Sequence, residues 1–224
     1  MDDMKRYEIF ASIKVDPPFI VRLDGWNFHA LAKKLALKVP FDENFARALA
    51  NTAAYLMKEF NAEVGYAFSD EINLLFKHAP FGRVEKIDSI FAGLASSKLA
   101  MELGCKHVVS MDCRIVKLPE EKIQEYFAWR QAECKRNHNN AYAYWLLRKQ
   151  GLTPREAQHK LHGLNTEQLK ELCKSYGIDL DKTPRWQREG IWIRWESYEK
   201  EGYNPLLKRK EKATRRKLII DFQR

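Results

Sequence analysis

The chain has 224 residues, a hydrophobic content of 45% and a formal net charge of +9, with a sequence pI near 9.3. This composition predicts a packed core, and the sequence holds neither a signal-peptide pattern nor a run near the roughly 20 apolar residues that span a bilayer, so we expect a soluble, cytoplasmic protein without membrane contact. The excess of basic residues favours an anionic partner such as nucleic acid, although solvated surface lysines give the same charge.

The first part of the chain alternates between strand and helix signals. Residues 19–23 form a short β-rich run after two prolines and predict a strand that ends at Asp24. Asp42 is typical of a helix N-cap, and the apolar residues that follow it at helical spacing predict a helix over residues 43–60.

A hairpin, a second helix and another strand come next. Residues 63–68 and 72–76 predict short strands joined by residues 69–71 (SDE), which places acids at the hairpin tip. A helix over residues 83–103 and a strand over residues 108–118 follow. The order β-α-β-β-α-β is that of the ferredoxin-like split βαβ arrangement, so the predicted class is α+β: an antiparallel sheet with two helices on one face.

A long helix follows the predicted sheet. Pro119 starts this helix, which runs to about Gly151, and residues 1–150 are assigned to one domain. The four cysteines form no C-x-x-C pair and lie near no histidine at metal-ligand spacing, which predicts reduced thiols rather than a zinc site.

Residues 151–224 are assigned to an appendage with capped helices and a basic hairpin. Thr153 begins a capping box, and Asn165 begins the next helix. Residues 191–195 and 217–222 predict two strands, and the run between them is strongly basic. Such a run suits the phosphate backbone of a nucleic acid.

Two aspartates are expected to meet at one edge of the sheet. Asp24 ends the first predicted strand, and Asp70 lies at the tip of the hairpin that this fold places beside that strand. Close carboxylates repel each other and favour a cation between them, and Mg²⁺ takes carboxylate and phosphate oxygens. The alternative is that both segments are ordinary turns, where Asp and Gly are favoured for local reasons.

Three motifs resemble one known family. They are residues 22–29 (RLDGWNFH), 68–71 (FSDE) and 129–133 (WRQAE), with a further match at residues 151–154 (GLTP) followed by Ala157 and Gln158. In this order and spacing they resemble the tRNA-His guanylyltransferase family over nearly the whole chain. Members have a palm like that of DNA polymerases and add nucleotides in the reverse, 3′-to-5′, direction. The resemblance therefore implies a polymerase-like palm as the catalytic domain at residues 1–150.

The resemblance also implies the residues of the site. Asp24 and Asp70 would be catalytic and, with the carbonyl of Gly25, would bind two Mg²⁺ ions. The nucleoside triphosphate, GTP or ATP, would be held by Asp24, Gly25, Trp26, Asn27, Phe28, His29, Lys38, Ser69 and Asp70. The absence of a side chain at Gly25 lets the backbone approach phosphate closely.

Some of these assignments have an ordinary alternative. His29 could be a core histidine, and Lys38 could be a solvated surface lysine, as could the weaker candidate Lys86. The role of Glu71 stays open, either as a side chain pointing inward or as an acid behind the metal ligands.

The implied partner is tRNA, held through its phosphates. The candidate contacts are Arg130, Lys135, Arg136, Lys208, Arg209, Lys210, Arg215 and Arg216. The alternatives are an ion pair on the long helix for Arg130 and a polar helix face for Lys135 and Arg136. Family members assemble as dimers of dimers, so a homotetramer is implied. The candidates for its interface are Trp186, Trp192, Trp195 and Tyr198, although core packing explains them equally well.

One segment departs from the family pattern. Eukaryotic members carry His-Ile-Asn-Asn where this chain has residues 135–138 (KRNH), and that motif is associated with tRNA-His and its anticodon. The chain is more similar to the archaeal and bacterial guanylyltransferase-like branch, whose members repair truncated tRNA 5′ ends by templated addition. The implied function is templated 5′-end repair and/or guanylylation of tRNA-His. A nucleotide cyclase and a non-catalytic tRNA-binding protein remain as alternatives.

Overall fold

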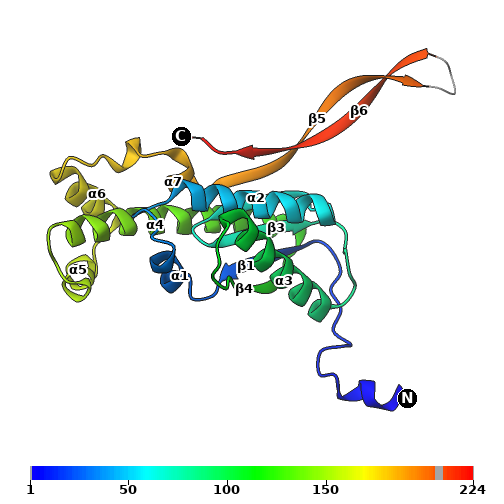
Figure 1. Ribbon diagram of the computed structural model, residues 1–224, viewed down its shortest axis with the longest axis horizontal. Coiled ribbons are helices and arrows are strands. Elements are labelled where there is room, and N and C mark those ends of the chain that lie inside the picture. The colour runs from blue at the N-terminus through cyan, green and yellow to red at the C-terminus, as the bar shows by residue number, and fades with distance from the viewer. Residues whose placement is uncertain (1, 205–208, 224) are drawn as a thin grey trace.

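A computed structural model describes residues 2–204 and 209–223 of the chain and confirms the α+β class (Figure 1). The first half holds β1 (Phe19–Gly25), α1 (Phe28–Lys34), α2 (Glu43–Phe60), β2 (Val64–Phe68), β3 (Glu71–Phe76), α3 (Val84–Leu103) and β4 (Met111–Lys117). The second half holds α4 (Ile123–Lys149), α5 (Pro154–Leu161), α6 (Thr166–Ser175), α7 (Arg185–Glu189), β5 (Ile191–Asn204) and β6 (Arg209–Asp221). The short helices α1 and α7 were not predicted.

The described strands form a single antiparallel sheet in the order β4-β1-β3-β2-β5-β6. The first four strands have the order of the split βαβ arrangement, as predicted. β5 pairs with β2, from Ala67 opposite Ile191 to Val64 opposite Arg194. This pairing makes the strand that was assigned to the appendage the fifth strand of the main sheet. Its side chains Ile191 and Ile193 are buried there. The domain boundary at residue 150 stays a prediction.

Helices cover both faces of the sheet, whereas the sequence predicted helices on one face. Val21 and Leu23 of β1 belong to the core cluster that α2 and α3 complete. Ile20, which points to the opposite face, packs in a second cluster with Tyr126 and Phe127 of α4. The long helix is therefore a third layer, and it covers the face that the prediction left open.

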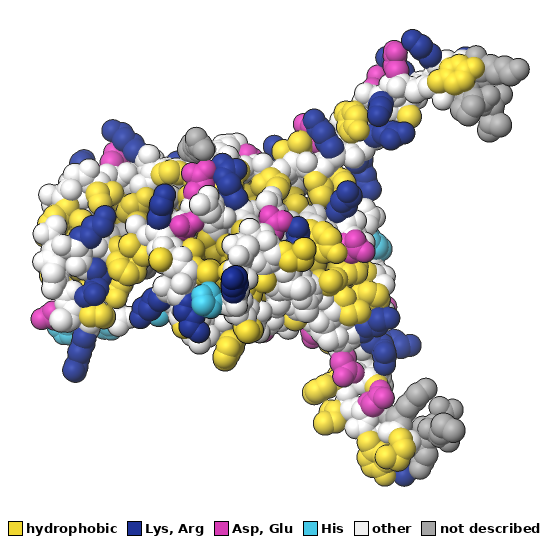
Figure 2. All heavy atoms as spheres, in the orientation of Figure 1, with side chains coloured by type: hydrophobic (Ala, Val, Ile, Leu, Met, Phe, Trp, Pro, Cys, Tyr) yellow, Lys and Arg dark blue, Asp and Glu magenta, His cyan; other side chains and the backbone are white. Residues whose placement is uncertain are grey.

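The β5–β6 hairpin projects from the body as a two-stranded ribbon (Figure 1). Its strands stay paired from Trp192 opposite Asp221 to Asn204 opposite Arg209. The basic run is therefore mostly β6 strand and not a loop, while Lys208 lies outside the described residues. Lys and Arg side chains lie along this ribbon in Figure 2.

Two of the aromatic residues considered for an interface pack within the chain. Trp186 is buried, and Trp195 packs against the main core while its Nε1 donates a hydrogen bond to the carbonyl of Ala62 at 2.8 Å. Core packing is therefore the correct interpretation for both.

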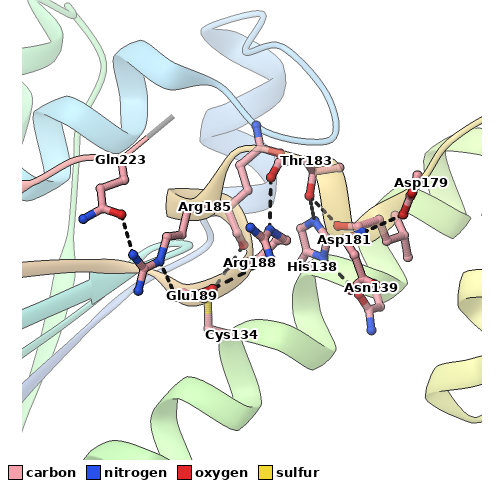
Figure 3. A network of polar contacts seen from close by, with 12 residues as sticks. Cys134, His138, Asn139, Asp179, Asp181, Thr183, Arg185, Arg188, Glu189 and Gln223 are labelled. Atoms are coloured by element: carbon pink, nitrogen blue, oxygen red, sulfur yellow. Dashed lines mark hydrogen bonds and ion pairs between the residues drawn. The ribbon is translucent and has the colours of Figure 1, made fainter.

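Polar contacts fix α7 and the turn before it to α4 (Figure 3). Nε2 of His138 lies 2.8 Å from Oγ1 of Thr183, and Nδ1 lies 2.9 Å from Oδ1 of Asn139. Arg188 donates from Nε to the carbonyl of Thr183 at 3.0 Å. Burial lowers the pKa of His138, so that the imidazole is neutral at pH 7 and serves as a packing element between the two helices.

The helices that follow α4 begin as predicted. Thr153 and Glu156 form the capping box of α5, and Asn165 and Gln168 form another at α6. Across the described ranges, no helix combines the length and the apolar character needed to cross a membrane.

Candidate active site

Acidic residues gather where β1, β3 and β4 lie side by side. Asp24 of β1 is opposite Glu71 of β3 and opposite Asp112 of β4. Directly opposite residues point to the same face of a sheet, so these three carboxylates form a row on the face that α4 covers. Asp70 lies in the turn just before Glu71. The structure therefore brings Asp24 and Asp70 to one sheet edge, as their spacing predicted.

Asp24 and Asp70 both line a hollow of about 310 Å³ beside α4. The lining residues are Arg22, Asp24, Phe68, Ser69, Asp70, Glu71, Trp129, Arg130, Glu133 and Asn137. The three motifs that are far apart in the sequence thus meet in a single concave site.

Electrostatics at this edge penalise negative charge. The pKa of Asp24 is raised to about 6, mainly by burial and then by the neighbouring carboxylates of Glu71 and Asp70, while Arg114 acts in the opposite direction. Burial also raises the pKa of Asp70, against the hydrogen bonds from its own backbone and from Ser69. A cation bound between the two carboxylates would relieve both effects.

Gly25 is required here by close packing. A Cβ added at Gly25 would lie 2.7 Å from Oδ2 of Asp70 and 2.3 Å from the ring of Phe28, closer than real side chains approach. Any other residue would therefore displace the Asp70 carboxylate or the Phe28 ring. Phe28 is itself buried and packs edge-on against Phe45, so its side chain belongs to the core. Only its backbone remains available to the predicted nucleotide.

The other residues of this loop lie at the surface. Trp26, Asn27 and His29 are exposed, and Asn27 adopts a left-handed conformation with φ 54° where the chain turns into α1. His29 is therefore not a core histidine. The backbone N–H of Trp26 donates to the carbonyl of Ser110 at 2.9 Å, which holds the loop against the segment before β4.

Glu71, whose role the sequence left open, forms a buried ion pair with Arg130 of α4. Nε and Nη2 of Arg130 donate to the two carboxylate oxygens at 2.8 and 2.6 Å, and both side chains are less than 10% exposed. Asn73 donates to the same carboxylate at 2.8 Å and accepts from the hydroxyl of Tyr126 at 2.6 Å. The geometry does not support the prediction that Arg130 contacts tRNA, because its guanidinium is buried against Glu71.

The donors at the acidic edge suit a hard cation that arrives with its own ligands. Within the described residues, no group of three or more His, Cys, Asp or Glu side chains is arranged to hold a metal ion. The predicted ligands Asp24, Asp70 and the Gly25 carbonyl would supply only part of an oxygen coordination sphere. Mg²⁺ is commonly bound in this way, through one or two carboxylates, water and substrate phosphates. The residues therefore fit Mg²⁺ brought with a triphosphate.

Two family models match the chain. The one described as tRNAHis guanylyltransferase matches residues 1–119, and the one described as the Thg1 C terminal domain matches residues 121–221. The chain belongs to the tRNA-His guanylyltransferase family. It is accordingly a nucleotidyltransferase.

Individual relatives cover most of the chain. The tRNA(His) guanylyltransferase of Debaryomyces hansenii is 31% identical over 89% of this chain and 82% of its own length. A bacterial tRNA(His) guanylyltransferase-like protein solved in complex with ATP has 31% identity and a TM-score of 0.73, over 86% of this chain and 87% of that one. A similar protein in complex with GTP has 29% identity and a TM-score of 0.68, over 95% and 89%.

In this member of the tRNA-His guanylyltransferase family, Lys38 is not among the residues that line the acidic hollow. It is exposed in the loop before α2, and its backbone N–H donates to Asp42 at 3.0 Å. It lines a separate hollow of about 560 Å³ with Phe41 and Pro184 among others. The weaker candidate Lys86 lies over the ring of Phe81 at 4.6 Å. The structure thus leaves the predicted triphosphate contact of Lys38 as a prediction.

The predicted tRNA contacts other than Arg130 lie at the surface where they are described. Lys135 and Arg136 are exposed on α4, and Arg136 is paired with Glu133. On β6, Arg209, Lys210, Arg215 and Arg216 are exposed. Arg209 is paired with Glu211, while Arg216 stacks on Trp195 and reaches Asn61 at 3.2 Å.

The hollow also contains residues that were quoted only as parts of motifs. Arg22 lies two positions before Asp24, and the two-residue period of a strand places it on the same face. Its Nε is buried without a hydrogen-bond partner in the described structure. Asn137, which belongs to the segment 135–138, lines the hollow from α4. Strand alternation could have identified Arg22, whereas nothing in the local sequence indicates the placement of Asn137.

Proposed function

We propose that this chain adds nucleotides to the 5′ end of tRNA in the 3′-to-5′ direction, using nucleoside triphosphates and two Mg²⁺ ions. The observation that carries the proposal is the pair of carboxylates, Asp24 and Asp70, whose pKa values are raised at one edge of the sheet. Family membership supports nucleotidyl transfer to tRNA. The ATP and GTP complexes of the bacterial relatives support triphosphates as substrates.

Asp24, Asp70 and the Gly25 carbonyl would hold the metal ions. When bound, the ions supply positive charge that activates a hydroxyl and stabilises a pyrophosphate leaving group. The chain contributes the positions of the ligands. Gly25 leaves room for the Asp70 carboxylate, and the Glu71–Arg130 pair fixes the hairpin tip that carries Asp70.

The reaction would have up to three steps. A triphosphate transfers its nucleotidyl group to the 5′-monophosphate of tRNA and releases pyrophosphate. The 3′-hydroxyl of an incoming nucleotide then attacks the activated 5′ phosphate, and the activating nucleotide leaves as a monophosphate. Pyrophosphate can finally be removed from the new 5′ end. A tRNA that already carries a 5′-triphosphate would skip the first step.

The departure at residues 135–138 favours templated repair over strict recognition of tRNA-His. Lys135 and Arg136 are exposed and can reach phosphates. His138 is buried between Asn139 and Thr183, so its imidazole is not offered to an anticodon base. We therefore propose that the opposite strand near the tRNA 3′ end selects the added base.

The projecting hairpin favours tRNA over a small-molecule product. A cyclase that shares the palm needs no basic ribbon, whereas β6 carries exposed Arg209, Lys210, Arg215 and Arg216. Phosphate contacts along such a ribbon would hold the tRNA backbone. The homotetramer implied by the family resemblance and the cytoplasmic location expected from the sequence are further proposals.

One assay separates these functions. The chain is incubated with radiolabelled GTP, Mg²⁺ and a 5′-truncated tRNA, and the products are resolved by size. We expect label in the tRNA. Small cyclic products would support a cyclase, and unchanged GTP would support a non-catalytic tRNA-binding protein.

A further inference from the structure

The large aromatic side chain of Trp129 lies at the acidic hollow and has no assigned role. Trp129 lines the hollow together with Asp24 and Asp70, yet it is 48% exposed. Burying the apolar surface of an indole is favourable, and aromatic faces are the usual platforms on which nucleobases stack. Exposure alone explains little, since single exposed apolar residues are common on protein surfaces.

The orientation of Trp129 is fixed by the same contacts that fix the acidic turn. The guanidinium carbon of Arg130 lies 4.3 Å from the centroid of the Trp129 ring and 5.3 Å from that of Phe68. Arg130 is held in turn by both carboxylate oxygens of Glu71, the residue after Asp70. Tyr126 contacts the indole edge-on, with centroids 5.8 Å apart. The indole is therefore a rigid, half-open surface whose position is coupled to that of the catalytic carboxylates.

We propose that Trp129 is a stacking platform for a nucleobase bound in the hollow. This inference rests on the proposed function, because it places the base beside the phosphates that react at Asp24 and Asp70. Every base has a π-face, so stacking holds a base without selecting it. That property suits an enzyme in which pairing with a template makes the selection. The base belongs either to the nucleoside triphosphate or to the terminal nucleotide of the tRNA.

Two substitutions separate stacking from packing. Trp129→Phe keeps an aromatic face, whereas Trp129→Leu keeps apolar volume without one. The control is Tyr176→Leu, which removes a similarly exposed aromatic side chain (44%) at the end of α6. The KM for GTP and the KM for tRNA are measured separately for each variant. We expect Trp129→Leu to raise one of them by roughly 5- to 150-fold, with kcat nearly unchanged and with Trp129→Phe close to the wild type.

The substrate whose KM rises identifies the stacked base. A rise for GTP alone assigns it to the triphosphate, and a rise for tRNA alone assigns it to the RNA end. Equal effects of the Leu and Phe variants, or a change confined to kcat, would overturn the proposal and leave Trp129 as a packing residue. Circular dichroism checks that each variant is folded.

A binding measurement keeps this test independent of turnover. Tryptophan emission is titrated with GTP, with ribose 5-triphosphate, which lacks a base, and with the tRNA, in the wild type and in Trp129→Phe. Stacking predicts quenching by GTP or tRNA that Trp129→Phe loses, and none by ribose 5-triphosphate. Quenching identical in both proteins refutes the platform. If the platform is confirmed but the wild type never labels tRNA, the proposed function fails while this inference stands.

Discussion

The buried ion pair between Glu71 and Arg130 allows a stability prediction with an internal control. Arg130→Met removes one partner and leaves the Glu71 carboxylate buried, 7% exposed, and close to other acids. Breaking a buried pair in this way costs about 3–5 kcal/mol, since the remaining charge has lost both hydrogen bonds from the guanidinium. For a chain of this size, that loss corresponds to a fall in Tm of roughly 6–20 °C.

The matched control lies on the same helix. Arg136 pairs with Glu133 at the surface, with side chains 54% and 30% exposed, so Arg136→Met should cost less than about 1 kcal/mol. Unfolding in urea, followed by circular dichroism, measures both variants. The double variant Glu71→Gln/Arg130→Met removes the stranded charge while the amide oxygen can still accept from Asn73, so it should recover much of the loss. The reasoning is refuted if Arg130→Met is no worse than Arg136→Met, or if the double variant is the least stable of all.

Three further predictions concern the reaction and the RNA. Asp24→Asn or Asp70→Asn should abolish nucleotide addition and leave tRNA binding nearly intact; more than a few per cent residual activity would contradict the metal assignment. Because the folded pKa of Asp24 lies near 6, above the ordinary 3.8, its contribution favours the fold at low pH and declines as the pH rises between these values. Thermal stabilisation by Mg²⁺ and GTP should therefore weaken below about pH 6 in the wild type, and this pH dependence should be smaller in Asp24→Asn, which keeps only the Asp70 carboxylate. Binding of tRNA should weaken when five basic residues of the hairpin are neutralised together, namely Lys208, Arg209, Lys210, Arg215 and Arg216. The slope of log K against log salt should fall by about 0.7–0.9 for each lost phosphate contact, and an unchanged slope would place the RNA elsewhere.

Much of the fold could be predicted because its signals are local. The N-cap at Asp42, the capping box at Thr153 and the hairpin around Asp70 depend on residues within one turn, and the structure confirms each of them. The short helices α1 and α7 were missed because five to seven residues give too little periodicity.

The tertiary contacts that complete the site could not be predicted. Glu71 and Arg130 are 59 positions apart, and their ion pair exists only because α4 crosses the face of the sheet that the sequence left uncovered. Pairing between β2 and β5 is similarly non-local, since it joins Val64 to Arg194. The sequence therefore predicted that Asp24 and Asp70 meet, but not that the carboxylate of Glu71 is paired with the guanidinium of Arg130.

That distinction supports our proposal that Asp24 and Asp70, among the acids at this edge, are the metal ligands. Glu71 has a cation within hydrogen-bond distance in Arg130, and Asp112 has one in Arg114 at 2.5 Å. In the part of the chain that the structure describes, no ion pair involves Asp24 or Asp70, although burial raises the pKa of both. Arginine side chains of the protein thus balance the charges of Glu71 and Asp112, whereas the charges of Asp24 and Asp70 are left for a bound ligand to balance. Asp24 and Asp70 both line the hollow, and we propose that divalent metal ions supply the missing positive charge there while also binding the oxygens of the triphosphate.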